Sequence, residues 1–303
     1  MAEIKKGKRM KRLIQKKLKK TKENLYYILS ALMIGLIVGG IDALFGRVLI
    51  AITDFRGRYI QIFIWFLPIA GLFICWMYHR FNEMSLKGMT LVLETAQGKR
   101  ADIPLALVPL VMVGTWITHL FGGSAGREGV AVQIGATLSH WFARRFKFAD
   151  NRTILLIAGM AAGFGGLFQT PFAAVFFAME VVVTGKMLYQ AFLPSLVAAV
   201  TASTFSNALG LEKFAVPLKQ SFNLSESKTM FYMVILGVSF GLTGRVFSVL
   251  LKRAKAFMGE KLANPYWICI NTACNNSFCI LEWSLLWSWN KSYITDIYRR
   301  RNF

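Results

Sequence analysis

The chain has 303 residues, a formal net charge of +21 at pH 7, and 55% hydrophobic but only 17% charged residues. Soluble domains carry about 45–50% apolar and about 25% charged residues, so this composition excludes a disordered chain, a coiled coil and a disulfide-built secreted module. It predicts an integral membrane protein with several spans. The four cysteines show no paired metal spacing, and we expect neither a metal site nor a disulfide framework.

The N-terminal 24 residues form a basic tail. Residues 1–22 contain eleven Lys or Arg and a single acid, Glu3. By the positive-inside rule such a segment stays in the cytoplasm, and it is too long and too charged to begin a signal peptide. Binding to anionic lipid head groups or nucleic acid is the alternative. We expect no nucleic-acid partner, because an apolar stretch starts directly after Asn24.

Uncharged stretches recur along the rest of the chain and predict membrane helices. They are residues 24–41, 59–78, 103–126, 129–143, 153–179, 187–211 and 229–244. A span needs about 20 apolar residues, and some of these stretches are shorter. Expected interruptions are Gly122–Gly123, Gly163, Gly165–Gly166, Pro171 and Pro194. Broken helices at membrane depth indicate a transporter site, although the small residues of 158–163 favour close helix packing.

Two adjacent charges lie inside an apolar region, in the segment GGSAGREGVAVQIG at residues 122–135. We predict a helix from about Glu128 to Trp141, whose free N–H groups and dipole attract anions. Gly126 and Gly129 allow close approach of the backbone to a ligand. The Glu128 carboxylate can occupy the anion position and leave once it is protonated. The alternative is an Arg127–Glu128 pair that only holds a loop.

The segment GSAGREGV followed by an apolar helix resembles the GREGP-type motif of the CLC family of chloride channels and anion–proton antiporters. Residues 165–180, GGLFQTPFAAVFFAME, resemble the next conserved block of that family, and the resemblance covers residues 25–265. It implies an all-α polytopic membrane fold with two inverted half-repeats of tilted and broken helices, assembled as homodimers with one pore per subunit. It places the gate at Glu128 and anion-binding positions at Gly126, Arg127, Gly129 and Val130.

Two departures from the family pattern point to one branch. Chloride-handling members carry GSGIP at an earlier helix start, whereas residues 85–91 here read SLKGMTL. Gly88 and Met89 are therefore further anion-binding candidates, with Met89 in place of the serine. Val130 replaces the proline of GREGP. Both features, and the spacing from Met89 to Glu128, resemble the fluoride–proton antiporter branch, although an ordinary core or lipid-facing methionine is the alternative for Met89.

Other polar residues in the apolar stretches are weaker candidates. Glu180 aligns with the first of two adjacent acids in chloride–proton members, and Val181 stands where the second acid, the inner proton relay, would be. We expect Glu180 to be a structural charge at a helix end. Asp42 and Glu94 lie near span ends, where we expect interfacial or paired carboxylates, and His119 is expected to be a satisfied neutral side chain.

The C-terminal end differs in composition from the rest. The last 44 residues contain no glycine but hold four of the eight tryptophans and three of the four cysteines. We interpret this change as a frameshift or artefactual stop near Trp267, or alternatively as a diverged terminal segment. The predicted organisation is a basic tail at 1–24, the first half-repeat at 25–223, the start of the second at 224–267 and an aberrant tail at 268–303, with the second half-repeat largely missing.

The sequence thus predicts fluoride export coupled to proton entry, gated by Glu128, with no enzymatic activity, cofactor or metal. The expected partners are fluoride or chloride ions, protons, the lipid bilayer and a second copy of the chain. The expected location is a bacterial plasma membrane with the N-terminus in the cytoplasm. Two alternatives stay open. One is a chloride channel or chloride–proton antiporter of the same fold, and the other is an inactive truncated fragment.

Overall fold

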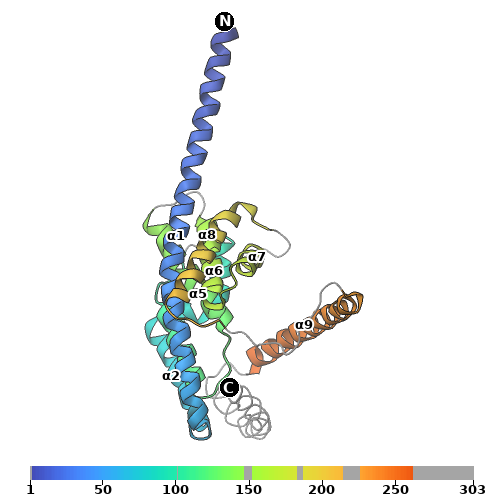
Figure 1. The fold of residues 1–303 in the computed structure, drawn as a ribbon. Coiled ribbons are helices and arrows are strands. Elements are labelled where there is room, and N and C mark those ends of the chain that lie inside the picture. Colours follow the sequence, from blue (N-terminus) through green and yellow to red (C-terminus); the bar gives the residue numbers. More distant parts are fainter. Residues whose placement is uncertain (1, 101, 147–151, 183–186, 214–225, 262–303) are drawn as a thin grey trace. The chain divides into compact units, whose positions relative to one another are not determined.

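The computed structural model describes residues 2–100, 102–146, 152–182, 187–213 and 226–261, and the regular elements within these ranges are all helical (Figure 1). The chain divides into two units, Met1–Lys213 and Phe214–Phe303. The predicted all-α fold is therefore confirmed for the described part of the chain. The predicted aberrant tail at 268–303 lies outside the described residues.

The first unit contains the helices that form a common core. In chain order these are α1 (Ala2–Phe63), η1 (Ile64–Phe66), α2 (Leu67–Phe81), η2 (Glu83–Lys87), α3 (Met89–Ala96), α4 (Leu107–Leu120), α5 (Arg127–Arg145), α6 (Arg152–Phe168), α7 (Pro171–Val181), η3 (Tyr189–Ala191) and α8 (Phe192–Ala208). In the second unit the described helix is α9 (Ser227–Lys261). The basic tail continues into the first apolar stretch as one helix, α1, whose backbone departs from helical angles at Tyr59.

Length and composition separate full spans from shorter inserted helices. Three segments are long and apolar enough to cross a membrane among the described residues, namely Leu25–Phe81, Tyr189–Ala208 and Ser227–Leu250. The helices α4, α6 and α7 are apolar but shorter. This mixture agrees with the expectation of complete and incomplete helices at membrane depth.

The predicted interruptions are only partly correct. Gly122–Gly123 follows α4, with Gly122 at φ +82°, and Pro171 is the first residue of α7. Gly163 and Gly165–Gly166, however, lie inside the continuous helix α6, and Pro194 lies in the first turn of α8. A proline is tolerated in a first helical turn because no intrahelical partner is lost there.

The glycines of α6 serve helix packing, as the composition of residues 158–163 predicted. The helix lies at the centre of the first unit, in contact with α1, α5, α7 and α8 (Figure 1). A Cβ atom on Gly163 would overlap the carbonyl oxygen of Ala131, and one on Gly135 would overlap that of Gly159. The backbones of α5 and α6 therefore touch directly, which small residues alone permit.

A second close approach joins the first helix to the last helix of this unit. A Cβ atom on Gly39 would lie 2.7 Å from the carbonyl oxygen of Ala202, and one on Gly35 would lie 2.6 Å from that of Ala198. The helices α1 and α8 thus meet along small residues four positions apart on each helix. Segments that are far apart in the sequence are fixed side by side by this contact.

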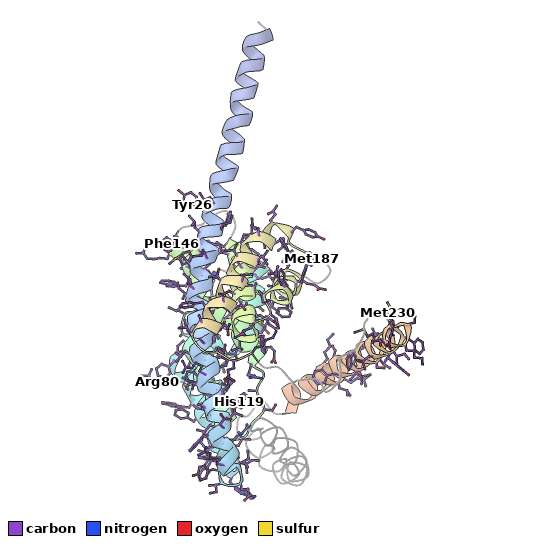
Figure 2. All side chains as sticks on the ribbon, in the orientation of Figure 1. Tyr26, Arg80, His119, Phe146, Met187 and Met230 are labelled. Carbon is purple, nitrogen blue, oxygen red and sulfur yellow. The ribbon has the colours of Figure 1, made fainter. Side chains whose placement is uncertain are left out.

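Labelled residues show the direction in which the helices of the bundle run. In Figure 2, Tyr26 and Phe146 lie near one end of the bundle, and Arg80 and His119 lie further along it. Because Phe146 directly follows α5, the C-terminal end of α5 lies at the end where the apolar part of α1 begins. The first turn of α5 is therefore directed toward the opposite end of the bundle.

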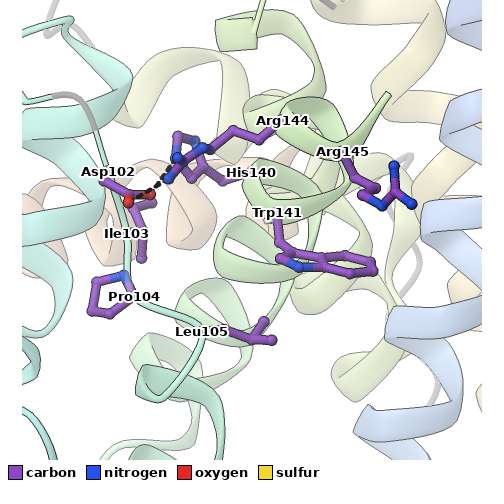
Figure 3. A pocket seen from close by; sticks show the side chains of 8 residues that line it. All are labelled: Asp102, Ile103, Pro104, Leu105, His140, Trp141, Arg144 and Arg145. Atoms are coloured by element: carbon purple, nitrogen blue, oxygen red, sulfur yellow. Dashed lines mark hydrogen bonds and ion pairs between the residues drawn. The ribbon is translucent and has the colours of Figure 1, made fainter. Parts of the chain in front are cut away.

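An ionic cluster fastens the loop before α4 to the last turns of α5. The buried His140 ring donates a hydrogen bond from Nε2 to Oδ1 of Asp102 at 3.2 Å, and the Arg144 guanidinium pairs with the other carboxylate oxygen (Figure 3). These residues border a cavity of 410 Å³ that Trp141 and Arg145 also line. The cluster holds the loop against the end of α5 that lies away from Glu128.

This cluster sets the ionisation of Asp102. Partial burial on its own raises the pKa of the Asp102 carboxyl, but hydrogen bonds and charge attraction from Arg144 and His140 outweigh that effect and lower the pKa below its usual value. A carboxyl group with a lowered pKa stabilises the folded state above its unfolded-state pKa of about 3.9. That contribution is lost as the pH falls through the folded-state value.

The packing of α5 on α6 is testable with a single methyl group. We expect Gly163→Ala to lower the free energy of unfolding by about 1–3 kcal/mol or more, because the added carbon overlaps backbone that cannot move aside. Gly57→Ala is the matched control, since no atom of the described residues lies within 4 Å of a Cβ atom at Gly57. Thermal unfolding of the purified chain in detergent measures both, and equal melting temperatures would contradict the close packing.

The ionic cluster makes a prediction about pH. Asp102→Asn is expected to lower the melting temperature at pH 7. The difference from the wild type should begin to shrink as the pH falls below about 3.9, and the two should converge once the pH has passed the lowered pKa of the native Asp102 carboxyl. Asp54→Asn, at an exposed position of α1, controls for the loss of one charge. A difference between Asp102→Asn and wild type that stays constant from pH 7 to pH 3 would argue against the ion pair.

Candidate functional site

The first turn of α5 has the properties of an anion-attracting helix start. The helix begins at Arg127, one residue before the predicted start, and Gly126 is its N-cap with extended backbone angles. Gly126 has no side chain to cap the helix, so the first N–H groups stay available. With 19 residues, α5 is long enough for its dipole to add partial positive charge at this point.

Glu128 places a carboxylate at that positive end. It is the acidic residue of the first turn of α5, and its side chain is exposed in the described chain. Its Oε2 lies 3.0 Å from the point that a Cβ atom on Gly126 would occupy. The carboxylate is thus folded back over the helix start, and a larger residue at position 126 would crowd it.

A second helix starts nearby, as predicted for residues 88–89. Gly88 is the N-cap of α3 and has φ +49°, a left-handed conformation that favours glycine. Met89 is the first residue of α3, and its partly buried side chain packs against the main hydrophobic core. The position of Met89 at a helix start is as predicted, while its part in anion binding stays a prediction.

A cavity of 360 Å³ is bordered by Gly88, the N-cap of α3, and by Val130 of α5. Its walls come from α2, η2, α4 and α5. The lining residues are Ile74, Cys75, Tyr78, Ser85, Leu86, Gly88, Val111, Gly114, Thr115, Thr118, Val130 and Gln133.

The cavity separates the predicted site residues into two groups. Gly88 and Val130 border it, so the structure brings these two candidates together across 42 positions of sequence. Gly126, Arg127, Glu128 and Gly129 are grouped instead at the start of α5, beside the cavity rather than in its wall.

Sequence reasoning did not single out Ser85 and Gln133, which also border this cavity. Ser85 belongs to η2, and its backbone N–H donates to Oδ1 of Asn82 at 3.2 Å, which fixes the turn before α3. Gln133 lies on α5 after the charged motif. The only signal in the sequence was their polarity within apolar surroundings, which does not reveal that they border the same cavity.

The other polar residues of the apolar stretches have the surroundings that we expected, with the exception of Asp42. Glu94 pairs with Arg100, and Nδ1 of His119 lies 2.9 Å from the carbonyl oxygen of Thr115, so both are satisfied as expected. Glu180 is exposed in the last turn of α7, at a helix end.

The expectation for Asp42 was wrong. Its side chain is fully buried between helices, and neither carboxylate oxygen has a hydrogen-bond partner within the described chain. The expectation was based on the position of Asp42 near the end of an apolar stretch. That position did not reveal that α6 and α8 pack against Asp42, with Gly166 and Ala202 close to its side chain.

The described residues hold no group of three or more His, Cys, Asp or Glu side chains that could bind a metal ion. The start of α5 offers helix N–H groups, the Arg127 guanidinium and the Glu128 carboxylate. Such a site can bind an anion and a proton in turn without forming a covalent bond.

Comparison with known proteins gives a family. A family model described as voltage gated chloride channel matches residues 70–282. A chloride/fluoride channel protein from Pseudomonas syringae pv. tomato is 34% identical over 227 residues, which is 75% of this chain and 50% of that protein. An uncharacterised protein of Methanocaldococcus jannaschii is 29% identical over 207 residues, 67% of this chain and 49% of its own length. The chain thus spans about half the length of these curated relatives.

Solved structures agree on the architecture. A crystal structure of a CLC-type fluoride/proton antiporter is similar with a TM-score of 0.79 and 43% identity, covering 88% of this chain and 66% of that one. A slow cyanobacterial Cl⁻/H⁺ antiporter has a TM-score of 0.69 at 21% identity, covering 82% and 62% of the two chains, and this likeness concerns the fold alone. The predicted CLC-type architecture is confirmed.

The family match begins within α2 and runs to residue 282, past Trp267. The boundaries at residues 24, 223 and 267 stay predictions, and packing alone divides the chain after Lys213. Because the match covers more than half of the residues, and because apolar helices of spanning length accompany it, this chain is an integral membrane protein that belongs to the CLC family of voltage gated chloride channels.

Proposed function

We propose that this chain is part of a CLC-type transporter that moves fluoride out of the cell in exchange for protons, with Glu128 as the gate. The observation that carries the proposal is the carboxylate in the first turn of α5, folded back over the glycine-capped helix start. A carboxylate in this place competes with an inorganic anion for the same positive helix end.

The exchange follows from the two charge states of one side chain. As a carboxylate, Glu128 occupies the helix start and excludes a second negative charge. As a neutral acid it loses its attraction to the dipole, so it leaves and an anion takes its place. Each change of occupant therefore moves a proton in one direction and an anion in the other, since the two states of the site differ in which ligand they bind.

The direction of the bundle supports proton arrival from outside. The basic tail favours a cytoplasmic N-terminus by the positive-inside rule. The start of α5 is directed away from the bundle end that holds Tyr26. With this orientation Glu128 faces the outer side of a bacterial plasma membrane, where protons have access to its exposed side chain.

Fluoride is favoured as the anion by two residues and by two relatives. Met89 occupies the start of α3 where a serine donor would suit chloride, and Val130 follows the glycine of the charged motif. The Pseudomonas relative is described as a chloride/fluoride channel protein, and the structure with 43% identity as a fluoride/proton antiporter. Chloride transport is the second candidate, since a relative from Salmonella typhimurium at 24% identity is described as a chloride channel.

A second copy of the chain is the proposed partner. The outer faces of α7 and α8 present large apolar side chains that are exposed, namely Phe172, Phe176, Phe192 and Leu193. Lipid can cover such a face, but aromatic residues in neighbouring helices also suit a self-complementary contact in a symmetric dimer.

Selectivity is the first test of the proposed function. The chain reconstituted in liposomes is expected to release fluoride faster than chloride, as read by ion-selective electrodes. Met89→Ser should narrow this ratio by about tenfold, because a hydroxyl donor to a bound halide is gained. Met84→Ser, at an exposed position of η2, is the control and should leave the ratio unchanged. Equal fluxes of the two anions in the wild type would remove the fluoride assignment, and no flux of either would favour an inactive fragment.

Proton coupling is the second test. Glu128→Gln keeps the length of the side chain but cannot change its charge, so we expect turnover to stop or to lose its dependence on pH. The measurement is fluoride efflux at several external pH values. Glu212→Gln, which removes an exposed acid outside the helices, should behave like the wild type. A pH profile of Glu128→Gln that matches the wild type would exclude Glu128 as the gate.

A further inference from the structure

A cavity at the C-terminal end of α5 combines basic and apolar side chains. It has a volume of 410 Å³ and lies between residues 102–105 and the last two turns of α5 (Figure 3). Small-molecule sites in proteins have volumes of about 300–1,000 Å³, so this cavity is large enough for a ligand. The proposed gate, Glu128, lies at the other end of the same helix and makes no use of it.

The charges around this cavity are mostly positive. Arg144 and Arg145 belong to its lining, and Asp102 is the acidic residue there. Arg152, the first residue of α6, is close enough to act electrostatically on His140 in the same lining. Three guanidinium groups therefore accompany one carboxylate at this end of the bundle, and the excess of positive charge favours a negatively charged ligand.

Arg145 is the cation that the fold does not use. The Asp102 carboxylate is shared between His140 and Arg144. Arg145 is exposed and forms no ion pair with another described residue. A cation in the last turn of a helix does interact favourably with the helix dipole, but that interaction leaves the fork of N–H donors unoccupied. Such a fork matches the oxygens of a phosphate group.

The rest of the lining is apolar and partly open. Trp141 and Leu105 line the cavity and are exposed, and in Figure 3 they lie on the side of the lining away from the Asp102–Arg144 pair. Tryptophan is enriched where membrane and water meet, because its ring is amphipathic. A free inorganic anion gains nothing from such a surface, whereas the acyl chains of a phospholipid can cover it.

The cavity lies at the end of the bundle where anionic lipids are expected. Phe146, which directly follows Arg145, lies near the same end as Tyr26 (Figure 2), and the basic tail at residues 1–22 precedes Tyr26. The positive-inside rule directs this end toward the cytoplasmic leaflet. Basic pockets between membrane helices on that side bind the head groups of anionic lipids.

We propose that this cavity binds one anionic phospholipid of the inner leaflet. Arg145 and the remaining N–H groups of Arg144 donate hydrogen bonds to its phosphate, and its acyl chains lie along Trp141 and Leu105. The bound lipid thereby joins residues 102–105 to α5 beside the ion pairs of Asp102 and stabilises the bundle. This inference does not depend on which anion the protein transports.

The test follows lipid binding through stability. Phosphatidylglycerol is titrated into micelles that contain the purified chain and phosphatidylcholine, and the melting temperature is recorded. A ligand of the native state raises the melting temperature with its concentration. We expect Arg145→Gln to need about five- to tenfold more phosphatidylglycerol than the wild type for the same rise, because a charge and a hydrogen bond to the phosphate are lost. Arg145→Lys should lie between the two, since it keeps the charge but not the fork of donors.

Matched variants separate this cavity from general effects of charge and hydrophobicity. Arg58→Gln removes an exposed arginine of α1 that does not line the cavity and should respond like the wild type. Trp141→Ala should need several-fold more phosphatidylglycerol, because apolar contact with the lipid is lost. Trp76→Ala, which removes an exposed tryptophan of α2 outside the cavity, should not.

A second arm distinguishes a lipid head group from a free phosphate. Inorganic phosphate at the same concentration should leave the melting temperature unchanged, because it cannot use the apolar part of the lining. A rise equal to that with phosphatidylglycerol would assign the cavity to a free oxyanion and overturn the proposal. So would an absence of any rise in the wild type, or equal responses of Arg145→Gln, Arg58→Gln and the wild type. These measurements involve no ion flux, so a failure of the proposed fluoride transport leaves the lipid site standing, and a failure of the lipid site leaves the gate at Glu128 standing.

Discussion

The direct contact between the backbones of α5 and α6 is the constraint on which the rest of this structure depends. Gly135, Gly159 and Gly163 leave no room for a single added carbon. Without a solvent-driven hydrophobic effect in the bilayer, such close van der Waals packing is a main source of helix association. Because it fixes α5 along its length, it also fixes the point where α5 starts, and with it the position of Glu128.

The packed apolar core lies next to a cavity wall that contains buried polar atoms without hydrogen-bond partners among the described residues. The helices around α6 bury apolar side chains such as Leu155, Ile157 and Met160 completely. In the neighbouring cavity wall, Oγ of Ser85 and Oε1 of Gln133 have no hydrogen-bond partner among the described residues. Pairing these atoms within the protein would stabilise the fold but would leave no donors for a ligand. Such unsatisfied groups are expected where a protein exchanges stability for binding.

Local sequence features predicted where the helices begin. They did not predict which segments far apart in the chain pack against each other. Glycine before two adjacent charges marked the start of α5 to within one residue, because N-terminal N–H groups and the residues around them follow local rules. The same residue type was misread at Gly165–Gly166, which lies inside α6. Asp42 was misread for a similar reason, since its burial comes from α6 and α8, which are far from it in the sequence.

Hydropathy and glycine placement act over a few residues, so the amino-acid sequence was enough to predict an all-helical membrane protein, the start of α5 to within one residue, and a carboxylate at that start. That Gly88, Val130, Ser85 and Gln133 border one cavity is seen in the folded chain and not in the sequence. Their meeting depends on how η2 and α5 are held against α2 and α4, and a linear pattern contains no information about which faces of separate helices converge.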